Sequence, residues 1–262
     1  RYYFKRNSEF AYLKAETLDE HEELQRLVFV KRNESKDNCY VIVKYLVNLK
    51  RAFDLKPDTE NDKQILIKKV KRIKYLHSLS KQLNYNGFNY QKYIYKKAIK
   101  LKKFQNVGIE FMTKAKTCIL ADDVGLGKTI QSIASLCHLI NKKEITGKII
   151  IIALSSIKHQ WKDAIKESVK FNITPELKNI IIVEGSRKKR RELYKKNAKV
   201  YIMNYEQFIF DYPSVVSLSR DVDAVIVDEA SAIKNVDTKR TQKIKTLLNH
   251  CKVKFLLTAT PI

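Results

Sequence analysis

Two short segments of this chain combine glycines, a lysine and carboxylates in patterns that could bind phosphate groups and transfer them to water. The first is residues 121–132, which lie between an apolar run and a helical pattern. Gly125 and Gly127 allow the backbone to turn its N–H groups toward an anion, and the next helix adds its positive N-terminal end. Lys128 can neutralise the β- and γ-phosphates of a nucleotide, and the Thr129 hydroxyl can bind Mg²⁺. A strand, a glycine-containing loop and a helix in this order predict a phosphate-binding loop.

One position of this loop departs from the usual pattern. A glycine commonly opens such a motif, and Asp122 stands there instead. The alternative interpretation is an ordinary connection between a strand and a helix, in which Lys128 and Thr129 only begin the helix. The nucleotide interpretation therefore needs support from elsewhere in the chain.

The second segment gives that support about a hundred residues later, where Asp228 and Glu229 follow an apolar run at 223–227. Carboxylates at the end of a buried strand cost free energy unless they meet a cation or a proton. In P-loop ATPases the aspartate holds the Mg²⁺ shell and the glutamate orients the attacking water. Asp228 could instead cap a helix. Together the two segments predict ATP hydrolysis, with Lys128, Asp228 and Glu229 as catalytic residues and with Thr129 and Asp228 as Mg²⁺ ligands.

Six motifs of the chain, in family order, resemble those of the Snf2 family of helicase superfamily 2. The phosphate-binding loop looks like motif I of that family, which tolerates the missing glycine and carries a glutamine where Gln131 stands. The other five are a glutamine-containing segment at 104–111, motif Ia at 150–161, motif Ib at 201–206, an extended motif II at 228–235 and motif III at 256–262. The resemblance covers about residues 98–262.

This resemblance implies a DNA-stimulated ATPase that uses ATP with Mg²⁺ and translocates on double-stranded DNA. The nucleotide would be held by Gln105, which would read adenine, and by Asp123, Gly125, Leu126, Gly127, Lys128, Thr129 and Ile130. Thr258 and Thr260 would relay the nucleotide state toward DNA, and Ser155, Lys158 and Asn204 would contact backbone phosphates. Because such contacts position a strand without reading its sequence, binding should weaken steeply with salt.

Two positions depart from the family pattern. Motif II usually reads Asp-Glu-x-His, and Ser231 replaces the histidine. That histidine couples the nucleotide site to motif III, so the coupling here would use a hydroxyl or a different route. Ala153 stands where motif Ia often has proline, which is a milder change.

Alternating strand and helix patterns predict an α/β fold, a RecA-like P-loop lobe whose parallel sheet is covered by helices. The predicted strands are 117–121, 148–153, 179–183, 199–203, 223–227 and 253–258, and the predicted helices are 98–114, 128–141, 156–169, 186–196, 204–210 and 237–249. The nucleotide should bind at the carboxyl ends of the strands. We assign this lobe to residues 96–262.

Residues 1–95 are predicted to form a smaller, mostly helical accessory domain that contacts DNA, restrains the motor or docks an accessory protein. Aromatic residues near 2–4 and 10–13 indicate a short hairpin, and apolar spacing over 62–83 indicates a helix. Residues 38–53 could be helix or strand, and we favour a helix.

The net charge of +24 favours a polyanion as partner. A basic cluster at 187–191 has three interpretations: a solvated helix face, a backbone-phosphate contact or a nuclear localisation signal. The four cysteines and five histidines have no metal-ligand spacing, so we expect no structural metal, and no apolar run is long enough for a membrane span. We therefore expect an intracellular protein that works with DNA, in a bacterial or viral-host cytoplasm or in a nucleus.

The chain stops within motif III and does not start with methionine, so we expect it to be the N-terminal part of a longer motor. A second RecA-like lobe would be its partner and would supply arginines to the transition state. Such an arginine is worth several orders of magnitude in rate, so this chain alone should be nearly inactive in hydrolysis. Two alternatives stay open: a nucleotide-gated DNA-binding module with weak catalysis, and another superfamily 2 translocase that acts on RNA or in DNA restriction.

Overall fold

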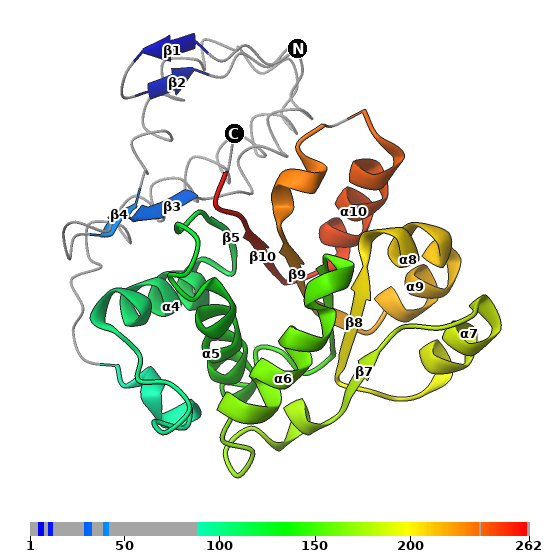
Figure 1. The fold of residues 1–262 in the computed structure, drawn as a ribbon, viewed down its shortest axis with the longest axis horizontal. Coiled ribbons are helices and arrows are strands. Elements are labelled where there is room, and N and C mark those ends of the chain that lie inside the picture. The colour runs from blue at the N-terminus through cyan, green and yellow to red at the C-terminus, as the bar shows by residue number, and fades with distance from the viewer. Residues whose placement is uncertain are drawn as a thin grey trace, which may run out of the picture.

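The computed structural model describes residues 5–7, 10–12, 29–32, 39–41, 88–235 and 237–260. Within them, an eight-stranded sheet has the order β4-β3-β5-β10-β9-β6-β8-β7 (Figure 1). Its strands are β3 (Phe29–Arg32), β4 (Cys39–Val41), β5 (Thr117–Leu120), β6 (Lys148–Ala153), β7 (Ile180–Ile182), β8 (Val200–Asn204), β9 (Val222–Asp228) and β10 (Val253–Leu257). All neighbours pair in parallel except β3 and β4, which are antiparallel. The six strands from β5 to β7 form the predicted parallel sheet.

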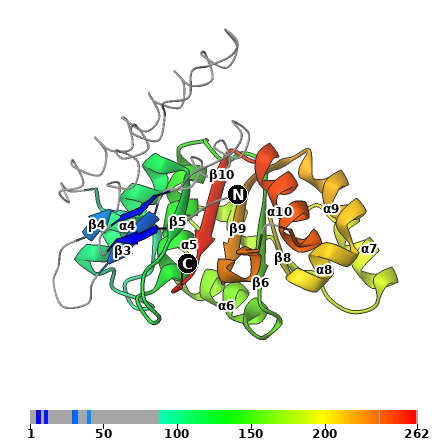
Figure 2. The ribbon, with the colours of Figure 1, turned by 90° about the horizontal axis from the view of Figure 1, so that it is seen from above.

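Helices cover both faces of this sheet. The α-helices are α4 (Lys103–Ala115), α5 (Lys128–Asn141), α6 (Lys158–Ser168), α7 (Arg187–Lys195), α8 (Tyr205–Phe210), α9 (Tyr212–Ser219) and α10 (Lys239–His250). Short 3₁₀ helices are η1 (Tyr90–Tyr93), η2 (Ser155–Ile157), η3 (Pro175–Lys178) and η4 (Ala230–Ile233). Figures 1 and 2 show α4 and α5 together near β5, and α7, α8 and α9 at the β7 end.

Strand periodicity divides the core into two layers. In β6, Ile149 and Ile151 belong to a cluster with α4, α5 and α6, whereas Ile150 and Ile152 belong to a second cluster with α8, α9 and α10. Successive strand side chains point to opposite faces, so an unbroken apolar run is what a strand covered on both sides requires. The run of isoleucines from 149 to 152 therefore positions β6 in the middle of an α/β sandwich.

The strand register brings the carboxyl ends of the central strands into one row. Leu257 of β10 pairs with Leu120 of β5 on one side and with Asp228 of β9 on the other. Ile152 of β6 pairs with Val227 of β9. Neighbouring strands lie about 4.8 Å apart, so the segments that follow β5, β10 and β9 begin at the same edge of the sheet. The candidate site lies at this edge of the sheet.

Most predicted elements of the 96–262 region match the structure within a few residues, and α5 and β6 match at both ends. The predicted helix at 98–114 starts later, at Lys103, and α9 was not predicted. A hairpin is present as β1 (Lys5–Asn7) and antiparallel β2 (Phe10–Tyr12), so its second strand lies where predicted and its first strand lies later than the predicted 2–4. Residues 39–41, for which we favoured a helix, form β4, because they pair with β3. The helix at 62–83 lies outside the described residues, and the boundary near 95 stays a prediction.

Candidate nucleotide site

The loop between β5 and α5 has the backbone that a phosphate-binding loop needs. Gly125 and Gly127 have φ angles of +83° and +76°, in the left-handed region that side chains rarely adopt. Gly127 directly precedes α5, so the first free N–H groups of that helix face the same edge of the sheet as the loop. A Cβ atom on Gly127 would lie 2.5 Å from Nε2 of Gln105, whereas one on Gly125 would meet nothing within 4 Å. A side chain at Gly127 would therefore meet both the cost of the left-handed conformation and a contact that Gln105 would have to relieve.

Gln105 braces this loop from the start of α4. Its Oε1 accepts a hydrogen bond from the backbone N–H of Lys102 at 2.9 Å, and its Nε2 donates to the carbonyl of Leu126 at 3.1 Å. The side chain is buried and links the first turn of α4 to the loop. The role in reading adenine stays a prediction, and the contacts that the structure shows go to the protein backbone.

Asp122, which replaces the usual first glycine, is fully buried. Its Oδ2 accepts a hydrogen bond from Nε2 of Gln131 at 2.9 Å, and the same Nε2 lies 3.3 Å from the carbonyl of Leu126. Gln131 sits one turn inside α5, so this pair fastens the loop to its helix. The side-chain amide of Gln131 on the adjacent helix thus bonds one of the two oxygens of this buried carboxylate.

The other predicted nucleotide contacts lie around this loop. Nζ of Lys128 donates to the carbonyls of Asp122 at 2.9 Å and Asp123 at 3.2 Å, so the ammonium lies over the loop. Asp123 is exposed, and Leu126 and Thr129 are half-buried. Ile130 differs, because its side chain is buried in the core cluster beneath α5.

Asp228 is the last residue of β9, and its carboxylate is held by two N–H donors. The indole Nε1 of Trp161 donates to Oδ2 at 2.7 Å, and the backbone N–H of Glu229 donates to Oδ1 at 2.9 Å. Burial raises the pKa of Asp228 above its usual range, while these two donors and the charge of Lys128 act in the opposite direction. Lys128 thus acts electrostatically on Asp228, across the row of strand ends.

Glu229 adopts a left-handed backbone conformation, with φ of +51°. This is uncommon for a residue other than glycine, because it costs about 1–3 kcal/mol and persists only where the surroundings impose it. Tyr205 helps to impose it, because its hydroxyl donates to the carbonyl of Asp228 at 2.5 Å and lies 3.2 Å from that of Glu229. Backbone strain is common at functional sites, so its presence at the residue predicted to be the general base is consistent with that role.

Thr258 and Thr260 follow β10, between the loop and Asp228. The backbone N–H of Thr258 donates to the carbonyl of Leu120, the last residue before the loop, at 3.1 Å. The buried Oγ1 of Thr258 accepts from the N–H of Thr260 at 3.1 Å. Ser231 lies half-buried in η4. The structure thus brings motifs I, II and III together, and their roles in coupling stay predictions.

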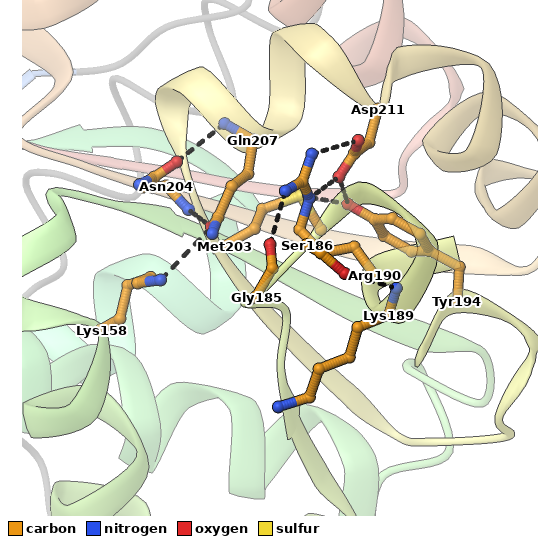
Figure 3. A network of polar contacts seen from close by, with 10 residues as sticks. All are labelled: Lys158, Gly185, Ser186, Lys189, Arg190, Tyr194, Met203, Asn204, Gln207 and Asp211. Atoms are coloured by element: carbon orange, nitrogen blue, oxygen red, sulfur yellow. Dashed lines mark hydrogen bonds and ion pairs between the residues drawn. The ribbon is translucent and has the colours of Figure 1, made fainter. Parts of the chain in front are cut away.

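The three predicted phosphate contacts differ in exposure, and Figure 3 shows two of them, Lys158 and Asn204, beside Gln207. Ser155 is exposed at the start of η2. Lys158 is only 5% exposed, and its Nζ lies 3.3 Å from Oε1 of Gln207; burial lowers its pKa. Asn204 caps α8: its Oδ1 accepts from the N–H of Gln207 at 2.8 Å, and Gln207 Oε1 accepts from the N–H of Asn204 at 3.0 Å. Lys158 and Asn204 thus meet at Gln207, where both already have protein partners.

Sequence reasoning missed two side chains at this site. Trp161 was noted only as part of motif Ia, and Tyr205 only as part of motif Ib, although both contact residue 228. Neither pairing has a signal in sequence spacing, because the partners are 67 and 23 positions apart. The capping box of Asn204 and Gln207 did have one, since an asparagine followed three residues later by a glutamine is a helix-start pattern.

Comparisons with known proteins agree with this geometry. The model of the SNF2-related domain family matches residues 41–262. The chain is 35% identical over 176 residues to the chromatin-remodeling ATPase INO80 of Kluyveromyces lactis, which covers 63% of this chain and 12% of that protein. It is 30% identical over 274 residues to the chromodomain-helicase-DNA-binding protein 8 of Rattus norvegicus, which covers 92% of this chain and 10% of that protein.

Among solved structures, the chain matches the Sulfolobus solfataricus SWI2/SNF2 ATPase core in complex with dsDNA. The TM-score is 0.51 and the sequence identity 25%, over 63% of this chain and 33% of that one. The Sulfolobus solfataricus SWI2/SNF2 ATPase core domain also matches, with a TM-score of 0.50 and 25% identity. The chain therefore spans about a tenth of the length of the curated relatives and about a third of the matched solved core.

Proposed function

Because this chain belongs to the SNF2-related domain family, we propose that it is the ATP-binding lobe of a DNA-dependent ATPase that translocates on double-stranded DNA. Membership of the family makes it an ATPase domain with a RecA-like α/β fold. The main support for ATP binding is the row formed by Leu120, Leu257 and Asp228. This row brings the phosphate-binding loop and the motif II carboxylates to one edge of the sheet.

Each side chain has a task that its position supports. The left-handed glycines and the start of α5 would hold the phosphates, and Lys128 would neutralise their charge. Oxygen donors suit Mg²⁺, and the carboxylate of Asp228 and the hydroxyl of Thr129 are such donors at this edge. When bound, Mg²⁺ would stabilise the charge that develops on the phosphate oxygens. Glu229 would accept a proton from the attacking water.

Double-stranded DNA is the proposed partner, since a matched ATPase core is described in complex with dsDNA. The net charge of +24 supports a polyanion. Ser155 lies exposed beside the ends of β6 and β8, at the same edge as the nucleotide loop. We infer that the protein works inside the cell, with DNA. Among the described residues no helix is both long and apolar enough to cross a bilayer.

We also propose that this chain alone hydrolyses ATP slowly. The matched solved core is about three times as long as its overlap with this chain. In P-loop enzymes an arginine supplied by another element raises the rate by about 10³–10⁵-fold. A second RecA-like lobe is the proposed source of that arginine.

The test compares nucleotide binding and steady-state hydrolysis by the wild-type chain, Glu229→Gln and Lys128→Ala, with and without duplex DNA. We expect the wild type to bind Mg·ATP and turn it over slowly, Glu229→Gln to bind but not turn over, and Lys128→Ala to lose binding. Fast DNA-stimulated turnover by this chain would overturn the two-lobe requirement. Binding without turnover, even when the complete protein is tested with DNA or RNA, would favour the nucleotide-gated module and direct attention to Ser231.

A further inference from the structure

Trp161 is the only tryptophan of the chain, and its indole reaches Asp228 at the candidate nucleotide site. It is 1% exposed on the inner face of α6 and donates its indole N–H to Oδ2 of Asp228 at 2.7 Å. A buried indole N–H needs an acceptor, and most would find a backbone carbonyl or water. Here the acceptor is the carboxylate predicted to bind the metal.

The second donor to that carboxylate comes from the backbone. The N–H of Glu229 donates to Oδ1 at 2.9 Å, so each oxygen of Asp228 has one N–H donor from a different element. Each carboxylate oxygen can accept in about two directions. The two donors therefore fix the plane of the carboxylate and leave the remaining acceptor directions for other partners.

Trp161 is itself held firmly. It packs in the core cluster with Ile165, one turn further along α6 and fully buried. One turn earlier, Lys158 is buried with its ammonium at Gln207 of α8. The indole thus cannot turn away from Asp228 without disturbing the face of α6 that packs on the sheet.

We propose that Trp161 is a positioning residue that orients the carboxylate of Asp228 for Mg²⁺. This inference rests on the proposed function, because it assumes that Asp228 holds the ion of a bound Mg·nucleotide. Outer-sphere partners of metal ligands typically contribute about 10–100-fold to metal affinity. Trp161 would do so from motif Ia, although it touches neither nucleotide nor metal.

The first experiment measures the affinity of this chain for a fluorescent ADP analogue, with Mg²⁺ and with EDTA. The quantity compared is the dissociation constant in EDTA divided by the dissociation constant in Mg²⁺, because this ratio reports how much Mg²⁺ strengthens binding. We expect Trp161→Phe to lower this ratio about tenfold and to keep the affinity in EDTA. Ile165→Val, a packing change on the same face of α6, should leave the ratio unchanged.

A ratio in Trp161→Phe equal to that of the wild type would overturn the proposal, whether or not both affinities fall by the same factor. Failure of the wild type to bind ADP in either condition is a different result, because it would contradict the proposed nucleotide site itself.

The second experiment needs no change at Trp161. Since the chain has a single tryptophan, its emission reports on this one indole. We expect the tryptophan emission of the ADP-bound wild type to change as Mg²⁺ is added. The midpoint of this change should fall at the Mg²⁺ concentration at which nucleotide binding tightens. Asp228→Asn keeps the indole and should lose the change. An unchanged emission in the wild type, or the same response in Asp228→Asn, would overturn the inference.

Discussion

At the scale of single residues, the two glycines of the nucleotide loop share a backbone conformation but differ in what surrounds them. Both have positive φ, yet only Gly127 has a neighbour where a Cβ atom would be placed. Its nearest neighbour is the amide of Gln105, which is already bonded to Lys102 and Leu126. Alanine variants of these two glycines can therefore separate the cost of the left-handed backbone from the cost of the contact with Gln105.

We expect Gly125→Ala to lower the free energy of unfolding by about 1 kcal/mol, the cost of a left-handed residue with a side chain. Gly127→Ala should lower it by about 1 kcal/mol more, because Gln105 must give up hydrogen bonds. Urea denaturation of both variants measures the difference. Equal losses would show that Gln105 moves aside at no cost.

Asp223, at the start of β9, accepts hydrogen bonds from the backbone N–H groups of Thr146 and Gly147 and pairs with Lys252 at 2.9 Å. Burial by itself would raise its pKa, but the N–H of Gly147, the ammonium of Lys252 and the N–H of Thr146 together lower it to about 2. This carboxylate thus links Lys252, just before β10, to Thr146 and Gly147, just before β6.

Because the folded pKa of Asp223 is below the unfolded value, its contribution to stability is present above about pH 4 and is lost as the pH falls toward about 2. We expect Asp223→Asn to cost about 1–3 kcal/mol at pH 7. The difference from wild type should shrink as the pH falls through that window, as followed by denaturation at each pH. Asp221→Asn, at a mostly exposed side chain, is the control and should show little of either effect.

At the scale of elements, helix α7 carries exposed basic side chains, and its Arg190 forms an ion pair with Asp211, just before α9 (Figure 3). Arg190 donates Nε and a terminal nitrogen to the two carboxylate oxygens of Asp211, at 2.6 and 2.9 Å, and donates to the carbonyl of Gly185 at 2.8 Å. The hydroxyl of Tyr194 also donates to Asp211 at 3.2 Å. Hydrogen bonding to Asp211 raises the pKa of Arg190.

Removing one partner of such a pair leaves a charge that is largely cut off from water. The side chains of Arg190 and Asp211 are 14% and 4% exposed, so we expect Asp211→Ala to cost about 3 kcal/mol of unfolding free energy. The matched control is Glu192→Ala on α7, whose pair with Lys195 is mostly exposed and should contribute less than about 1 kcal/mol. Thermal or urea unfolding distinguishes the two, and similar losses would contradict the anchoring role of Asp211.

At the scale of the whole molecule, the excess of positive charge predicts how DNA binding depends on salt. With a net charge of +24, log K should fall linearly with log salt, by about 0.9 for each phosphate contact. The interpretation of the basic cluster as a phosphate contact can then be measured directly. Of its side chains, Lys188 and Arg191 are exposed on α7, whereas Arg190 is bound to Asp211.

We expect the double variant Lys188→Gln, Arg191→Gln to weaken duplex binding and to reduce the salt slope by about 1–2, because each lost phosphate contact removes about one unit. Lys142→Gln, an exposed lysine just after α5, is the control and should leave the slope unchanged. Fluorescence anisotropy with duplexes of two unrelated sequences measures both effects. An unaltered slope in the double variant would favour the solvated-face interpretation.

The sequence by itself determined the architecture and the main chemistry of the nucleotide edge. An unbroken apolar run set the limits of β6, a period-3.6 apolar pattern set those of α5, and the parallel order followed from the alternation of strands and helices. Helix α9 escaped prediction because it is short and its valines and serines have weak helix propensity, and packing against α8 and α10 stabilises it. Local patterns of this kind predict an element only where propensity and burial agree.

Only the tertiary structure decided which side chains became partners. Lys158 has the residue type of a phosphate contact, but the packing of α6 buries it against Gln207. Asp122 looked like a defect in motif I until Gln131 was found beside it, and Asp228 meets an indole 67 residues away. Such pairings depend on how helices seat on a twisted sheet, which is set by the sum of many contacts and is not encoded in any single motif.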